Sequence, residues 1–173
     1  MGASSDQVME RMWLQQVKAF CQKRGWTSLE AGDPPQLLVQ WPVNGKPMLV
    51  QVAPHDGWGL MLLVPLGSVP QEIRQATLLA AGTLNYRLSL ACLELEPIQG
   101  EARARVTLTP AGELPEPLLE RAFRALEEAI AGLAMGVEMF CTLQKAAEAV
   151  EGLPAMRGAE AMLSLWESRP ATD

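Results

Sequence analysis

The sequence predicts an α+β domain with the element order α-β-β-β-α-β-β-α, in which helices cover an antiparallel five-stranded sheet. Three observations predict it. The 173 residues are enough for one core of ordinary size, short apolar runs are separated by Asn-Gly and Asp-Gly turns, and one apolar stripe continues at helical spacing over residues 116–150. We expect this domain to occupy residues 1–153, and a short C-terminal helix to form an appendage over residues 154–173.

The first helix is expected over residues 6–24, where apolar side chains recur at spacings of three and four. Ser5 or Asp6 is a suitable N-cap, and Gly25 follows two basic residues where the helix should stop. One face of this helix is therefore expected to join the core, and it carries Met9, Trp13, Val17, Phe20 and Cys21.

Three strands in an antiparallel meander are expected next, over residues 37–41, 47–53 and 58–66. Asn44-Gly45 and Asp56-Gly57 are typical of the tight turns that join such strands.

The third of these strands is apolar on both faces. Trp58 and Leu60 begin a row that continues to Leu66 on one face, and Met61 and Leu63 lie on the other. A half-solvated antiparallel strand would alternate with polar residues. We therefore expect both faces of this strand to be covered.

A second helix is expected from Pro70 to Asn85-Tyr86, followed by strands over residues 88–96 and 102–109. Apolar residues alternate with Arg and Thr in the last strand, which predicts one buried and one outer face.

The charges of this last hairpin predict its register. Pairing polar face with polar face puts Glu94 opposite Arg105 and Glu96 opposite Arg103, as structural ion pairs. The same register places Leu88, Leu90 and Cys92 on the outer face beside the charges.

An apolar end of an otherwise polar sheet face is a candidate contact surface. Alternatively, a loop or the chain's own C-terminal segment covers those three residues.

The longest helix is expected over residues 116–150, with an apolar stripe from Leu119 to Leu143. Such a stripe favours a helix that lies across the sheet, and a coiled-coil seam is the alternative. Gly152-Leu153-Pro154 is expected to end it. The appendage that follows is amphipathic, and its apolar residues are Met156, Ala159, Met162, Leu163 and Trp166.

The sequence carries no catalytic or metal-binding motif. His55 is its only histidine and lies in a turn, so any nucleophile–base pair would depend on one surface residue. Metal-ligand spacings, a nucleophile elbow and a phosphate-binding glycine loop are absent from the sequence. We therefore expect a non-enzyme with no cofactor and no metal ion.

The formal net charge of −6 excludes two classes of partner. Nucleic acid and anionic membrane surfaces both attract basic chains, so we expect neither as a partner. Cys21, Cys92 and Cys141 are odd in number and widely spaced, which favours a reducing compartment. A cytoplasmic protein is expected.

The element order, the acidity and the Leu84-Asn85 junction that closes the middle helix together resemble the bacterial YbjN-like proteins. Those proteins share the fold of the type III secretion chaperones, which are small, acidic and usually homodimeric. The resemblance covers roughly residues 6–150. It implies protein binding rather than catalysis, because such chaperones wrap an extended segment of a client protein along apolar surfaces of the dimer.

We therefore expect a non-enzymatic, chaperone-like protein-binding module that acts as a homodimer on a client protein. Partner contact is expected from residues of the two-sided strand, the predicted outer face and the terminal helix, namely Trp58, Leu60, Leu88, Leu90, Cys92 and Trp166. One alternative is a small-molecule-binding protein or enzyme with a pocket between the long helix and the sheet near His55. Another is a structural subunit that docks through the terminal helix around Trp166.

Overall fold

The computed structural model describes residues 5–149, and the side chains of residues 5–145. Its elements follow the expected order with one additional strand. They are α1 Ser5–Lys23, β1 Thr27–Ala31, β2 Gln36–Val43, β3 Lys46–His55, β4 Gly59–Ser68, the 3₁₀ turn η1 Gln71–Ile73, α2 Arg74–Asn85, β5 Ala91–Leu95, β6 Glu101–Leu108 and α3 Glu116–Ala149.

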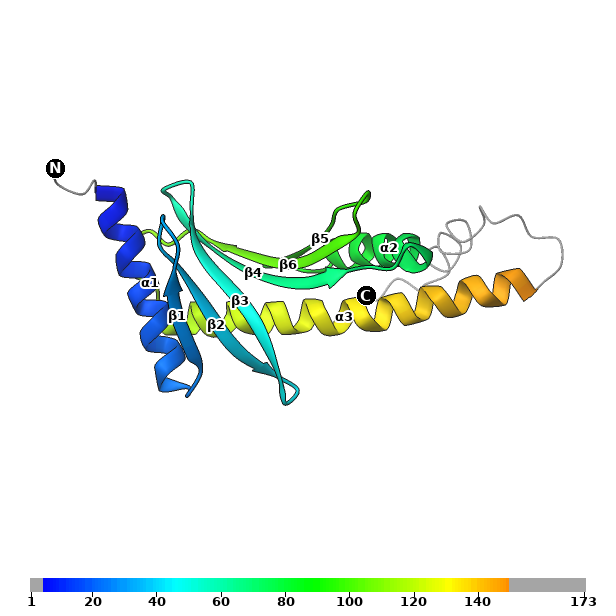
Figure 1. The fold of residues 1–173 in the computed structure, drawn as a ribbon, viewed down its shortest axis with the longest axis horizontal. Helices are drawn as coiled ribbons and strands as arrows, with labels where there is room; N and C mark the ends of the chain where they lie inside the picture. The colour runs from blue at the N-terminus through cyan, green and yellow to red at the C-terminus, as the bar shows by residue number, and fades with distance from the viewer. Residues whose placement is uncertain (1–4, 150–173) are drawn as a thin grey trace, which may run out of the picture.

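The strands form one antiparallel sheet in the order β1-β2-β3-β4-β6-β5 (Figure 1). The sheet has six strands, so the expectation of five was wrong. The additional strand, β1, reads Thr-Ser-Leu-Glu-Ala and carries no alternating apolar pattern, because none of its side chains is buried. It forms through pairing with β2, in which Leu29 lies opposite Leu38.

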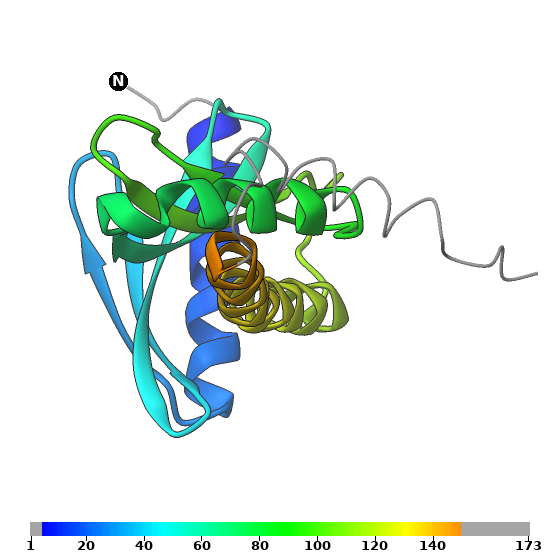
Figure 2. The same ribbon diagram turned by 90° about the vertical axis from the view of Figure 1, so that its right-hand side faces the viewer.

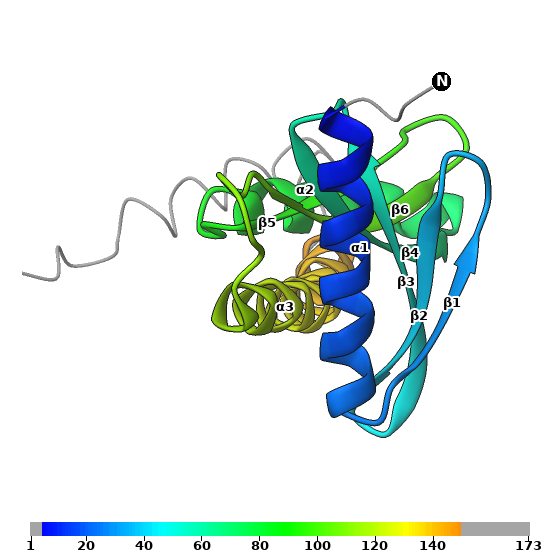
Figure 3. The ribbon, with the colours of Figure 1, turned by 90° about the vertical axis from the view of Figure 1, so that its left-hand side faces the viewer.

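The helices pack on one face of the sheet. α1 crosses the end of the sheet that carries β1 and β2, and α3 runs crosswise to α1 beneath β5 and β6 (Figures 1 and 3). α2 crosses α3 beside β5, and α3 continues past both α2 and the sheet (Figures 1 and 2). The expected 116–150 helix is therefore confirmed as a helix that covers the sheet. No helix within the described residues is long and apolar enough to cross a membrane.

An aromatic cluster holds α1, β2 and α3 together. The Phe123 ring of α3 lies 5.0 Å from Trp26, 5.4 Å from Trp41 and 5.7 Å from Phe20, measured between ring centroids. Each such ring pair stabilises the fold by about 0.5–1.5 kcal/mol beyond the area it buries. Trp13 adds a second link, because its Nε1 donates to the carbonyl oxygen of Gly112 at 2.6 Å.

The faces of β4 are as expected, but their environments differ. Leu60, Leu62 and Val64 are completely buried against the helices. Met61 and Leu63 point to the outer face and are half-buried. Leu63 lies between Gln51 of β3 and Arg105 of β6, so long neighbouring side chains cover it rather than a further layer of structure. The expected second cover is not found among the described elements.

The register of the β5–β6 hairpin differs from the expected one by two residues. Glu94 lies opposite Arg103, and Cys92 lies opposite Arg105. Glu96 belongs to the turn, where its carboxylate accepts hydrogen bonds from the backbone N–H groups of Ile98, at 2.9 Å, and Gln99. These bonds lower the pKa of Glu96. The backbone of the turn uses the carboxylate that the sequence analysis assigned to an arginine.

Gly100 joins this turn to the start of α2. Its backbone has φ of +80°, and a Cβ there would lie 2.5 Å from Nε of Arg74 and 2.7 Å from the carbonyl oxygen of Val69. Arg74 occupies the space because its guanidinium donates to the carbonyl oxygens of Val69, Ile98 and Gln99, at 3.0, 2.6 and 2.9 Å. Only glycine suits this position, both for its conformation and for the space around it.

Gly100→Ala is therefore expected to lower the free energy of unfolding by at least about 2 kcal/mol, since it combines a strained backbone with the displacement of Arg74. Urea unfolding followed by circular dichroism measures the change. The control is Gly112→Ala, where a Cβ meets no atom within 4 Å, and it should lie within about 0.5 kcal/mol of the wild type. Equal stability of the two variants would contradict the role of Gly100.

Candidate protein-binding surfaces

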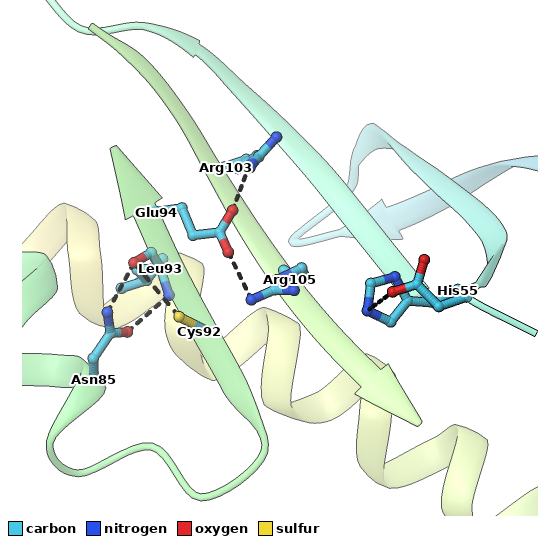
Figure 4. Close-up of polar contacts among 8 residues, drawn as sticks. His55, Asn85, Cys92, Leu93, Glu94, Arg103 and Arg105 are labelled. Carbon is cyan, nitrogen blue, oxygen red and sulfur yellow. Dashed lines mark hydrogen bonds and ion pairs between the residues drawn. The ribbon is translucent and has the colours of Figure 1, made fainter. Parts of the chain in front are cut away.

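The side chains that could take part in catalysis or bind a metal ion lie apart from one another. His55, at the end of β3, has its Nε2 3.7 Å from a carboxylate oxygen of Asp56 (Figure 4). Its ring also packs edge-to-face with Trp58, at 5.2 Å between centroids. Burial raises the pKa of the Cys21 thiol to about 11, so this cysteine is a neutral core residue at pH 7 and not a nucleophile. Within residues 5–149, no three His, Cys, Asp or Glu side chains form a group that could hold a metal ion.

The structure does not gather the expected contact residues on one surface. Leu60 is completely buried in the core, which excludes it from any exposed surface. Trp58 is 52% exposed in the β3–β4 turn. Trp166 lies outside the described residues.

The expected outer row of Leu88, Leu90 and Cys92 is also wrong in part. The strand begins at Ala91, so Leu88 and Leu90 lie in the connection after α2, half-buried against the main core. Only Cys92 reaches the outer face. Leu88 and Leu90 thus pack against the core, which differs both from the expected exposed row and from the alternative of cover by a loop or the C-terminal segment.

The outer face beside Cys92 is polar. The Glu94 carboxylate lies between two guanidiniums, 2.5 Å from Nε of Arg103 and 2.8 Å from an Nη atom of Arg105 (Figure 4). Arg103 lies directly opposite Glu94 in the observed register, and Arg105, which was expected opposite Glu94, reaches the carboxylate diagonally. Ion-paired side chains therefore make up the outer surface at this end of the sheet, and it is not apolar.

Asn85 closes the β5 edge of the sheet. Its side-chain amide donates to the carbonyl oxygen of Leu93 at 2.8 Å and accepts from the N–H of Leu93 at 2.7 Å (Figure 4). An unpaired strand edge is a template for another strand, and here a side chain takes the place of one. The Leu84-Asn85 junction noted in the sequence thus has a mechanical role: it ties the end of α2 to the edge strand.

The opposite edge is different, because no strand of the described chain pairs with the outer side of β1. β1 is held in place from the helix side. Lys18 of α1 forms an ion pair with Glu30 at 2.7 Å, and Gln15 donates to the same carboxylate at 3.1 Å. These two hydrogen bonds lower the pKa of Glu30.

An apolar patch lies on the outer face next to this open edge. We define the outer patch as Leu29, Leu38 and Leu49, of which Leu29 is 64% and Leu49 is 49% exposed. Leu38 lies directly opposite Leu29, and Leu49 is one diagonal step away on β3. The three leucines line a shallow hollow together with Thr27, Gln40, Pro47 and Met48.

The outer patch was not expected, although two features of the sequence point to it. Leu37-Leu38-Val39 and Met48-Leu49-Val50 are runs of three apolar residues, and a strand with such a run has an apolar side chain on each face. Residues such as Leu29 become visible only when the polar strand β1 is recognised.

A second exposed apolar row lies on the C-terminal half of α3. Met135, Met139 and Leu143 are 72%, 52% and 40% exposed. Leu143 was expected on the covered face of the helix. The helix has left the sheet by that point, and it is Phe140 that packs against α2.

No protein-family model matches the chain, and no curated sequence matches it. Several chains of solved structures share its fold, and two of them align as follows. A chain of the HopA1–SchA chaperone–effector complex aligns with a TM-score of 0.54 at 17% identity, over 76% of this chain and 98% of that chain. YbjN from E. coli aligns with a TM-score of 0.50 at 11% identity, over 76% of this chain and 92% of its own. The chain has the YbjN-like fold that type III secretion chaperones share, as its element order predicted.

Asn85→Ala tests the closed edge. The substitution leaves the N–H and carbonyl groups of Leu93 without their partner, so we expect the free energy of unfolding to fall by about 1–3 kcal/mol. Gln99→Ala removes an amide of similar kind from an exposed turn and should change it by less than about 0.5 kcal/mol. Urea unfolding measures both, and a variant at Asn85 as stable as the wild type would contradict the assignment.

Proposed function

We propose that the chain is a non-enzymatic, chaperone-like module that binds an extended apolar segment of a client protein and acts as a homodimer in the cytoplasm. The observation that carries the proposal is the outer patch beside the open edge of β1. Together these two features can bind a client segment as an additional strand. The β1 edge offers backbone hydrogen bonds to the client, and the outer patch contacts every second side chain of the client.

The geometry favours an extended client over a helical one. A strand added at β1 projects every second side chain to the outer face, where Leu29 and Leu38 already form a cross-strand pair. The Lys18–Glu30 ion pair keeps β1 against α1, so the edge is preformed rather than ordered on binding. The closed β5 edge gives a client no equivalent site.

The fold supports the same function class. The HopA1–SchA structure is that of a chaperone bound to an effector, so this fold is compatible with binding of another protein. The free state of all three cysteines in the described chain agrees with a reducing compartment. YbjN of E. coli is described as a candidate transcription regulator. The net charge of −6 does not favour direct DNA binding here.

One face of α2 supports the homodimer. Leu78 is exposed there, Gly82 lies one turn further along, and Tyr86 follows the end of the helix. A Cβ at Gly82 would meet no atom within 4 Å, so the backbone of α2 is open to close approach on this side. A second copy of α2 suits such a face, because apolar side chains flank a position without a side chain.

A pocket between α3 and the sheet near His55 has less support. One hollow of the described residues lies on the outer sheet face, and another lies on the C-terminal half of α3, along Met135, Met139 and Leu143. His55 itself lies in the β3–β4 turn, against Trp58.

The client site is tested with a labelled ten-residue peptide in which Leu and Thr alternate, and with a peptide of the same composition that groups the leucines. We expect fluorescence anisotropy to report tighter binding of the alternating peptide. Leu29→Glu with Leu49→Glu should weaken it by at least about tenfold, since burial of each leucine contributes about 1.5–3 kcal/mol. Ile98→Glu, at an exposed residue of the β5–β6 turn, is the matched control. Equal binding of the two peptides, or no effect of the double substitution, would refute the client site.

The homodimer is tested by light scattering across a concentration series. We expect about twice the chain mass of 18.8 kDa for the wild type, and about one chain mass for Leu78→Glu, because the substitution puts a charge into an apolar contact. A monomeric wild type contradicts the homodimer, and a dimeric Leu78→Glu variant contradicts its assignment to α2.

A further inference from the structure

Glu30 gives the open edge of β1 a negative charge. Side chains of a strand alternate between the two faces of its sheet, so Glu30 points to the helix side while its neighbour Leu29 belongs to the outer patch. The Glu30 side chain is 46% exposed although it contacts α1. A strand added at β1 would therefore meet a different surface on each of its faces.

The carboxylate of Glu30 is only partly used by the chain. Lys18 and Gln15 donate to the same oxygen, Oε1, at 2.7 and 3.1 Å. Within the described residues, no side chain or backbone group donates to the second oxygen, Oε2. The two hydrogen bonds lower the pKa of Glu30, so the group is ionised at pH 7 and can accept further hydrogen bonds.

The outer patch offers no charge of either sign. Every residue that lines its hollow is apolar or is an uncharged Thr or Gln. A charged client side chain on the outer face would therefore lose hydration without gaining a partner. Charge is recognised on the helix side instead, at the position of an added strand that lies directly opposite Glu30.

A basic side chain suits that position better than an acidic one. Opposite charges directly across two strands stabilise their pairing, and like charges destabilise it. An acidic client residue would lie next to Glu30 on the adjacent strand, whereas Lys18 belongs to the helix layer behind it. The net charge of −6 acts in the same direction, because it attracts a basic segment and repels an acidic one.

We propose that the client segment carries a lysine or arginine opposite Glu30, flanked by apolar residues that face the outer side of the sheet. The recognised segment is thus apolar on one face and cationic on the other. This inference rests on the proposed client site, and it specifies which extended segments that site selects.

Three labelled peptides test the inference. Each is the alternating Leu and Thr peptide described above, with one central Thr kept, replaced by Lys or replaced by Glu. We expect fluorescence anisotropy at low salt to show about two- to fivefold tighter binding of the Lys peptide than of the Thr peptide. The Glu peptide should bind more weakly than the Thr peptide. Both differences should shrink at about 0.5 M salt, which screens exposed charges.

Two substitutions should move this preference in opposite directions. Glu30→Gln removes the charge and keeps the shape, so the Lys and Thr peptides should bind it equally. Lys18→Gln removes the cation that competes for the carboxylate, so the preference for the Lys peptide should increase. The matched control is Glu101→Gln, which changes the net charge equally at an exposed position of β6 and should keep the wild-type preference. Unchanged binding of the Thr peptide by all three variants shows that the β1 edge is intact.

Equal binding of the Lys and Glu peptides by the wild type would overturn this inference alone, and the client site would stand. A preference that persists in Glu30→Gln, that does not increase in Lys18→Gln or that is lost in Glu101→Gln would contradict the pairing with Glu30. Binding of none of the three peptides would refute the client site, and this inference with it.

Discussion

The fold depends on a sheet that buries only one of its faces. The inner face is almost entirely aliphatic, and the aromatic cluster around Phe123 holds α1, β2 and α3 against it. With all three helices on that side, the outer face of the described sheet has only its own side chains to cover it. The two ends of this outer face differ. At one end the surface consists of the ion-paired Glu94, Arg103 and Arg105 side chains, and at the other end leucines are exposed.

The two sheet edges show the same asymmetry. Asn85 supplies a donor and an acceptor to Leu93, which is what a neighbouring strand would supply, so the β5 edge cannot recruit another chain without breaking α2 away. β1 has no such cap among the described residues, but its five-residue length limits how much strand can be added. The proposed client binding is therefore confined to the short open edge beside the exposed leucines, while the capped β5 edge is protected from pairing with other chains.

Sequence patterns were sufficient where burial follows a simple period. Spacing predicts the inward row of β6, the apolar face of α1 and the start of α3, because one face of each is buried there. They failed where tertiary contacts decide. β1 has no apolar period. Leu88 fits the alternation of a strand in the sequence, but in the structure it lies in the connection between α2 and β5. The sequence pattern allows Glu96 to pair with an arginine. In the structure the backbone N–H groups of its own turn donate to the Glu96 carboxylate instead, at a lower cost in conformational entropy.

The acidity of the chain has a physical role alongside its apolar surfaces. Exposed leucines and methionines favour non-specific association, and a net charge of −6 opposes it through repulsion between copies. A homodimer doubles that charge within one particle, so its interface must gain enough from apolar burial to offset the repulsion. This favours one well-packed interface, such as a face of α2 with Gly82 at its centre, over diffuse contact between sheets. In the proposed homodimer the outer patch remains open in each copy, so the proposal implies two client sites per dimer.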